Sequence, residues 1–179
     1  VGVDRIVTPL KPVASNGEKA VKSSPRQQPD GTWAYEWSVV ALSGDELAED
    51  VAKRKSVMSD QARQAFNDTL AAGFTDASGV TWSTASNARQ RIMDLTQRIQ
   101  EFRAGKMASA LPNGKNTVKL RDANETPHDV GPDGIVALAE QGSDFQDQAE
   151  DRLEQLLADI AAATSHADLD AIDVTAGWP

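Results

Sequence analysis

The stretch PDGIVALAEQGSDFQDQAEDRLEQLLADI, residues 132–160, decides the fold of this chain. Its apolar and small residues recur at steps of three and four, the spacing that places side chains on one face of an α-helix. In order, they are Leu138, Gly142, Phe145, Ala149, Leu153, Leu156 and Ile160. Pro132 is favourable in the first turn of such a helix, where no backbone N–H is needed. The pattern predicts a third and longest helix of about thirty residues, on the order of 45 Å long.

Two further helices are predicted upstream of this stretch. Ser43 and Glu46 have the S-x-x-E spacing of a helix-capping box, and a helix over about 45–72 follows them. Ser86 can cap a second helix that runs to about Lys106. Its apolar residues also step by three and four, and they are Ile92, Leu95, Ile99 and Phe102. Each buried Leu or Phe stabilises the fold by roughly 1.5–3 kcal/mol, so these seams need a partner surface.

Two arrangements can cover the apolar seams. The helices of one chain can pack against each other as a bundle, or the seams can meet other copies in an intersubunit coiled coil. In the second arrangement, the oligomer seam consists of Ile92, Leu95, Ile99, Phe102, Leu138, Phe145, Leu153, Leu156 and Ile160. Residues 74–83 and 111–130 carry turn residues between short β-prone pieces, which predict small hairpins. In the second of these, 111–114 is expected to turn into a strand at Val118. The fold class is therefore mainly α.

Residues 1–42 differ from the rest and are predicted to form an N-terminal attachment arm, with the helical domain over 43–179. Four prolines in the first thirty residues prevent a continuous helix and disfavour sheet pairing, so the arm is expected to be extended. They are Pro9, Pro12, Pro25 and Pro29. Next, large apolar residues occupy alternate positions, which predicts one strand with a single apolar face. These candidate partner-binding residues are Trp33, Tyr35, Trp37 and Val39.

The charge of the chain limits its partners. The formal net charge is −9, and residues 1–30 hold five of the 18 basic and three of the 27 acidic residues, which leaves −11 for the remainder. A body this acidic repels phosphate backbones and anionic lipid, so neither nucleic acid nor a membrane surface is expected as a partner. The chain contains no cysteine, which excludes disulfides and thiolate metal sites.

The residues that could perform chemistry are few. His128 follows a proline in a polar loop and His166 falls in the first turn of a short helix, so both are predicted to be ordinary surface histidines. Asp168, Asp170 and Asp173 lack the glycine and closing glutamate of a calcium loop. No phosphate-binding or dinucleotide-binding glycine pattern occurs. The sequence therefore predicts no enzyme, no cofactor and no metal site.

The chain closes on DLDAIDVTAGWP, residues 168–179. A tryptophan next to the last residue would leave a large ring in water unless this segment packs on the body. Ile172 and Trp178 are therefore predicted to dock the C-terminal segment.

This ending, above all AIDVTAGWP at 171–179, resembles the C-terminus of a domain of unknown function common in bacteriophage tail and fibre-associated proteins. AAGFTDASGVTWSTASNARQRI at 71–92 is similar to the central portion of that family, and TVKLRDANETPHDV at 117–130 to the segment before its last helix. The resemblance covers about 45–179. At 118–120 this chain departs from the family, in which an aromatic residue is frequent.

The resemblance implies a structural protein of the virion tail, a tail-fibre or baseplate component or adaptor. Such a protein would be synthesised in the host cytoplasm, would bind other phage tail proteins through residues 1–40, and would carry no catalytic residues. Threefold or sixfold repetition is common in tails, so a homo-oligomer is expected and a trimer favoured. The alternative is a tail-fibre assembly chaperone, which binds a fibre during folding and leaves afterwards.

Overall fold

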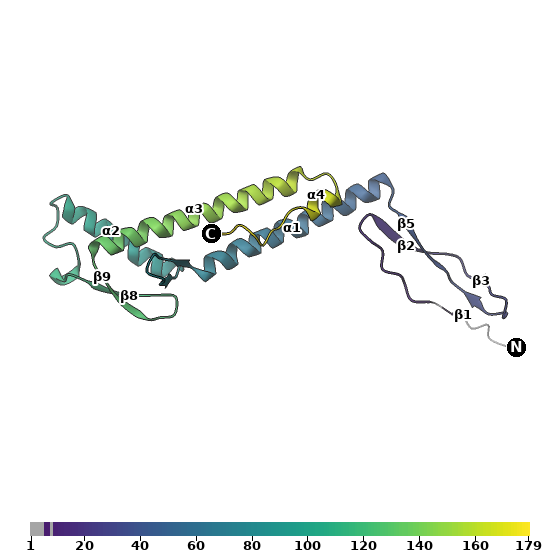
Figure 1. The fold of residues 1–179 in the computed structure, drawn as a ribbon, viewed down its shortest axis with the longest axis horizontal. Coiled ribbons are helices and arrows are strands. Elements are labelled where there is room, and N and C mark those ends of the chain that lie inside the picture. Colours follow the sequence, from purple (N-terminus) through teal and green to yellow (C-terminus); the bar gives the residue numbers. More distant parts are fainter. Residues whose placement is uncertain (1–5, 8) are drawn as a thin grey trace. The chain divides into compact units, whose positions relative to one another are not determined.

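The computed structural model describes residues 6–7 and 9–179 (Figure 1). It separates into two compact units. The first unit comprises residues 1–57 and 161–172, and the second comprises residues 58–160 and 173–179. The predicted division between residues 42 and 43 falls inside the first unit. The beginning of the predicted arm, residues 1–5 and 8, lies outside the described residues.

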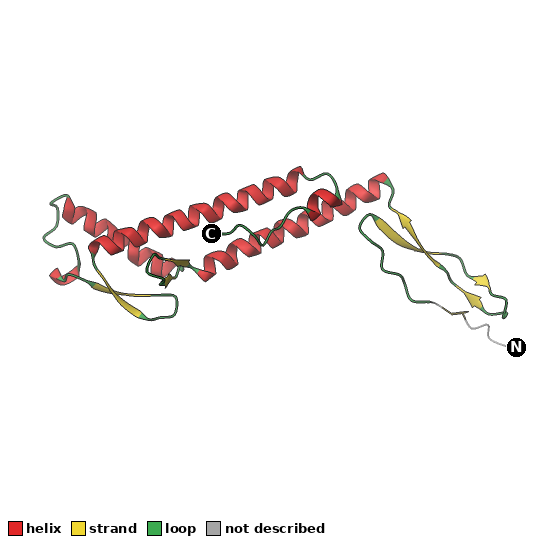
Figure 2. Cartoon of the chain, in the orientation of Figure 1, coloured by secondary structure: helices red, strands yellow, loops and turns green. Residues whose placement is uncertain are grey.

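The chain is mainly α, as the sequence predicts (Figure 2). Its three long helices are α1 (Gly44–Ala72), α2 (Ser86–Arg103) and α3 (Pro132–Ala162), and α4 (His166–Asp170) is a single short turn. Small antiparallel hairpins are also present, formed by β6 (Phe74–Thr75) with β7 (Thr81–Trp82) and by β8 (Val118–Arg121) with β9 (Pro127–Val130).

The second hairpin differs from the prediction in its turn. Residues 112–114 form a separate 3₁₀ turn, and the partner of β8 lies downstream, at β9. The carboxylate of Asp122 explains this choice, because it accepts hydrogen bonds from the backbone N–H groups of Asn124 and Thr126 at 2.8 and 2.9 Å. Such a local side-chain contact stabilises a turn after β8, and this turn brings Pro127–Val130 back along the strand.

The second unit is built on antiparallel packing of α2 and α3. At one end Arg89 Nη1 donates to Gln146 Oε1 at 2.7 Å, and at the other Arg103 forms an ion pair with Asp133. Between these ends lies a core that also includes side chains from both hairpins. Its buried members are Phe74, Trp82, Leu95, Ile99, Leu111, Leu120, Ile135, Leu138 and Phe145.

The predicted oligomer seam is largely covered within the chain itself. Ile92 and Leu153 are half-buried, and Phe102 is 41% exposed. The other six seam residues are buried: Leu95, Ile99, Leu138, Phe145, Leu156 and Ile160. The apolar stripes therefore form an intrachain core, and their burial gives no independent reason to expect other copies on these faces.

A single carboxylate organises the β6–β7 hairpin. Asp76 Oδ1 accepts from the backbone N–H groups of Ser78 (2.8 Å) and Val80 (3.1 Å), and Oδ2 accepts from the indole N–H of Trp82 at 2.7 Å. Burial, the largest single influence, raises the pKa of Asp76, but the hydrogen bonds from Ser78, Trp82 and Val80 together outweigh it and lower the pKa to about 2.

We expect Asp76→Asn to destabilise the protein by about 1–2 kcal/mol at pH 7, because an amide cannot accept all of these hydrogen bonds. A lowered folded-state pKa stabilises the fold above the unfolded value, 3.8, and this contribution is lost as the pH falls toward about 2. The difference in free energy of unfolding between the variant and the wild type, measured by urea unfolding, should therefore narrow between pH 4 and pH 2. Asp68→Asn, on exposed α1, is the control; an equal effect of both variants at pH 7 would contradict the role of Asp76.

Both histidines are more enclosed than the sequence predicts. The ring of His128 lies 5.4 Å from that of Trp82, and its Nε2 is 3.0 Å from Asp122 Oδ2. In the first unit, the His166 side chain is only 12% exposed, and its Nδ1 is 3.3 Å from Arg54 Nη1. The surface prediction is wrong for His166, whereas the His128 side chain is 30% exposed and packs on Trp82 with one face. Each contact comes from a residue distant in sequence, which local context could not reveal.

The short helix α4 is fixed to α1 within the first unit. Arg54 forms an ion pair with Asp170, and Leu169 is fully buried. Arginine can only donate, so His166 Nδ1 accepts and its proton lies on Nε2. This nitrogen is 3.0 Å from Asp50 Oδ2 but makes no well-aligned hydrogen bond. These contacts hold α4 against α1.

The C-terminal segment of the second unit packs on the helices. The ring of Trp178 lies 6.3 Å from that of Phe66 on α1, and its indole N–H donates to the carbonyl of Val174 at 3.1 Å. Arg152 on α3 donates to the carbonyl of Ala176 at 2.9 Å. Trp178 is half-buried, and so is Ile172 in the first unit. The segment is therefore docked rather than free.

Candidate interaction surface

The N-terminal part of the first unit is a long antiparallel ribbon, formed by residues 18–41 (Figure 1). At its base β2 (Glu18–Lys22) pairs with β5 (Trp37–Ala41), and at its tip β3 (Arg26–Gln27) pairs with β4 (Trp33–Ala34). A backbone hydrogen bond from Ser23 to Glu36, 2.8 Å long, links the two parts. The ribbon corrects the expectation of an unpaired extended arm. The proline-free stretch between Pro12 and Pro25 supplies β2, whose weak apolar pattern gave little sequence signal.

The four candidate partner-binding residues lie on this ribbon but not on one strand. Trp33 is in β4, Tyr35 is between strands, and Trp37 and Val39 are in β5. The single four-position strand is therefore wrong, since the ladder is interrupted at residues 35–36. The rings are half-buried by local contacts: Lys22 Nζ lies 3.5 Å from the centroid of the Tyr35 ring, and the Trp37 indole donates to the carbonyl of Pro9 at 3.1 Å.

Exposed apolar side chains are concentrated in the first unit. In the described part of the chain, nine large apolar residues are exposed, and seven of them lie between residues 10 and 57. Leu10 and Val13, ahead of the ribbon, are each 96% exposed. The other five are Val21, Val39, Val40, Leu47 and Val57. Scattered exposed residues are ordinary, but this concentration on one small unit is typical of a contact surface.

The register places exposed valines on both faces of the ribbon. Val39 lies on the same face as Trp37 and opposite Ala20, whereas Val40 lies on the other face, opposite Lys19. Val21, opposite Ser38, shares the face of Val40. The alternating sequence pattern indicated Val39 but not Val21 or Val40, because it predicts only one apolar face for this segment. Two adjacent valines, Val39 and Val40, place one apolar side chain on each face of a strand, so this pair could have indicated two apolar faces.

At the tip of the ribbon, β1 (Ile6–Val7) pairs in parallel with β4, but the outer edges of β2 and β5 at its base are open. In the part of the chain that the structure describes, β2 and β5 pair only with each other. Each strand therefore presents backbone N–H and C=O groups along its free edge, which is a template for an added strand. A two-stranded ribbon is marginally stable in water by itself, so a partner strand would stabilise it.

The base of the ribbon is attached to the first turn of α1. Lys19 on β2 forms an ion pair with Glu46, and the backbone N–H of Leu42 donates to the carbonyl of Gly17 at 2.9 Å. The hydrogen bond from Lys19 and those from Ser43 lower the pKa of Glu46 to about 2. The predicted capping box is present, because the Ser43 N–H donates to Glu46 and the Glu46 N–H donates to Ser43 Oγ.

Two further kinds of interaction, with metal ions and with membranes, depend on features that can be checked in the described ranges, 6–7 and 9–179. These ranges contain no group of three or more His, Asp or Glu side chains placed to hold a metal ion. Over the same ranges, no helix combines the length and apolar character needed to cross a membrane.

Comparison with known proteins places the helical part in a family. The model of a domain of unknown function, DUF4376, matches residues 52–176. No curated protein and no solved structure matches the chain. The matched range begins within α1 and extends to the C-terminal segment, so it leaves out the ribbon. It covers more than half of the 179 residues. The chain therefore belongs to the DUF4376 family.

Proposed function

We propose that this protein is a structural component of a bacteriophage tail, located in the virion and synthesised in the host cytoplasm. It serves as a tail-fibre or baseplate component or adaptor and binds a neighbouring tail protein through the ribbon. The tail assignment rests on the resemblance of residues 45–179 to tail-associated proteins. The binding role is supported by one observation above all, the concentration of exposed apolar side chains in residues 10–57.

The contact we propose is strand addition together with valine burial. A partner strand on the free edge of β5 would take up its unpaired backbone groups, and Val39 and Val40 would project to either side of it. Val39 and Val40 are 42% and 38% exposed, so a partner can add only part of the roughly 1.5–3 kcal/mol that full burial of a valine gives. The main-chain hydrogen bonds of the added strand supply the rest of the contact. Nucleic acid, membranes, cofactors and catalysis have no part in this proposal.

We also propose that the protein is a homo-oligomer, with a trimer favoured by the threefold repetition common in tails. The helical seam was the expected contact, either as an intersubunit coiled coil or as an intrachain bundle. Because six of the nine seam residues are buried within the chain, we assign the contact between copies to the ribbon instead. The seam then stabilises the individual subunit.

Light scattering on the purified full chain tests this assignment. The double variant Val39→Glu with Val40→Lys keeps the net charge and should convert a multimer into a monomer, with helical circular dichroism unchanged. The matched control, Gln61→Glu with Asn67→Lys on exposed α1, should stay multimeric. A wild-type monomer that is absent from virions would contradict the proposal.

The alternative function is a tail-fibre assembly chaperone. The acidic body favours it in one respect, because net charge keeps a bound client in solution. Mass spectrometry of purified phage particles separates the two functions. Stoichiometric copies of the chain indicate a structural component, whereas its presence in infected cells but absence from particles indicates a chaperone.

A further inference from the structure

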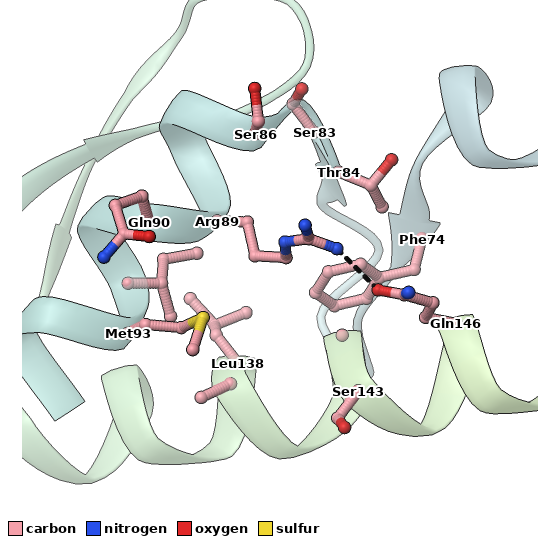
Figure 3. A pocket seen from close by; sticks show the side chains of 13 residues that line it. Phe74, Ser83, Thr84, Ser86, Arg89, Gln90, Met93, Leu138, Ser143 and Gln146 are labelled. Atoms are coloured by element: carbon pink, nitrogen blue, oxygen red, sulfur yellow. Dashed lines mark hydrogen bonds between the residues drawn. The ribbon is translucent and has the colours of Figure 1, made fainter. Parts of the chain in front are cut away.

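The second unit contains an open cavity of about 600 Å³ that the proposed function does not use. It lies between α2, α3 and the β6–β7 hairpin (Figure 3). Phe74, Ile92 and Leu138 supply much of its apolar lining. Gly142 on α3 allows the ring of Phe74 to approach, since a Cβ at this position would be 3.2 Å from Phe74 Cε1. The backbone of α3 at Gly142 therefore sets how closely the Phe74 ring approaches in this lining.

The only charged residue among those that line this cavity is a cation. Arg89 reaches across from α2 toward Gln146, as Figure 3 shows, while the hydroxyl oxygens of Ser83 and Ser86 lie farther out. Among the described residues, no carboxylate lies within ion-pair distance of Arg89, although the chain has 27 acidic residues and 18 basic ones. The Arg89 guanidinium donates instead to the neutral amide of Gln146.

The N-terminal end of α2, beside Arg89, is also electrostatically positive. The predicted cap, Ser86, is instead the first helical residue, and Ala85 takes the N-cap position without a side-chain hydrogen bond. No acidic residue lies in the first turn of α2. The partial positive charge of a helix N-terminus is usually offset by such groups. Here it adds to the charge of Arg89, so this end of the cavity attracts an anion.

The cavity continues along the helices. A second cavity of about 370 Å³ shares Gln90, Met93 and Ala139 with the first. Met93 is 55% exposed at this junction, and methionine is common on surfaces that adapt to bound peptides because its side chain is flexible and polarisable. The two cavities thus form one open groove, with Arg89 at the end that would receive a carboxylate, an apolar middle, and Asp94 in the lining of the far part.

We propose that this groove binds a short acidic segment of a partner polypeptide. An apolar side chain of the segment lies on Phe74, Leu138 and Met93, and a neighbouring Asp or Glu carboxylate pairs with Arg89 in a two-point contact that guanidinium geometry favours. A polypeptide is favoured over a small molecule because the groove is open and continuous. The site lies outside the ribbon and is independent of the proposed tail contact.

Methyl NMR of the full chain tests the proposal with defined peptides. The chain has three methionines, of which Met93 lines the groove, Met58 is buried in α1 and Met107 lines a different cavity. Titration with acetyl-Ala-Phe-Glu-Ala-amide should shift the ¹³C-methyl signal of Met93 saturably and leave Met58 and Met107 unchanged. The Phe-Gln peptide should bind at least tenfold more weakly.

Two charge-matched variants complete the test. Arg89→Gln should abolish the preference for the Phe-Glu peptide, whereas Arg63→Gln, which removes the same charge from exposed α1, should retain it. Both variants should keep the wild-type melting temperature, because both arginines are exposed. No saturable shift at Met93, or equal binding of the two peptides, would overturn the proposal. Tighter binding of free 3-phenylpropionate than of the peptide would also overturn it and would indicate a small-molecule site.

Discussion

Replacing Phe145 with aspartate should unfold the second unit. Phe145 is 8% exposed, and its ring centroid lies 6.1 Å from that of Phe74 across the core. Removing a buried phenylalanine costs about 3–5 kcal/mol, and placing a charge in the same apolar site adds a desolvation penalty. The sum is comparable with the whole stability of a typical domain, roughly 5–15 kcal/mol. Circular dichroism should show loss of cooperative melting and a large loss of helical signal.

Gln148→Asp is the matched control for this variant. It adds the same charge to the same helix, one turn away, but at an exposed position. It should melt within about 0.5 kcal/mol of wild type, as surface substitutions usually do. If Phe145→Asp also kept its melting temperature and helical signal, the face of α3 that carries Phe145 would be exposed in solution, and the intrachain core described above would be wrong.

The second large effect is expected at Gly73, which follows the last residue of α1. Its φ is +81°, and a Cβ there would lie 2.2 Å from the carbonyl oxygen of Trp82. Gly73→Ala therefore combines a left-handed backbone, which costs an alanine roughly 1–2 kcal/mol, with a clash against backbone that cannot rotate away, worth about 1–3 kcal/mol. We expect a total loss of about 2–5 kcal/mol in urea unfolding.

Gly79 separates the two contributions. Its φ is +83°, close to that of Gly73, but nothing lies within 4 Å of a Cβ placed there. Gly79→Ala should therefore cost only the backbone part, about 1–2 kcal/mol. The difference between the two variants measures the clash with Trp82. Equal losses would show that the β6–β7 hairpin moves away from Gly73 at little cost.

The helices could be predicted from sequence because their signals are local and repeated. The three- and four-residue steps from Leu138 to Ile160 define one face of α3 over its whole length, and Ser43 and Glu46 mark the start of α1. The hairpin at β8 was harder, since Pro112-Asn-Gly114 is as good a turn signal as the one at Asp122. Besides the local hydrogen bonds to Asp122, the turn that forms is stabilised by a contact with a distant segment, the hydrogen bond from the Ala123 N–H to the Thr81 carbonyl at 2.9 Å, which the sequence does not reveal.

The candidate surface could be predicted only in part. Alternation drew attention to Trp37 and Val39, and both lie on the ribbon. The pairing of β5 with β2 could not be found, because Glu18–Lys22 has only two apolar residues and no periodic signal. Arg89 was missed for another reason. It is an ordinary arginine in the sequence, and only folding places it at the end of an apolar cavity.

The docked C-terminal segment has a practical consequence for imaging. A fluorescent or electron-dense label placed next to Trp178 would compete with the Phe66 ring and with the hydrogen bonds from Arg152. Residues 113–117, at the end of the 3₁₀ turn and just after it, are all exposed, and none of them is a large apolar residue. An epitope inserted there would report the location of the subunit while leaving its helices intact.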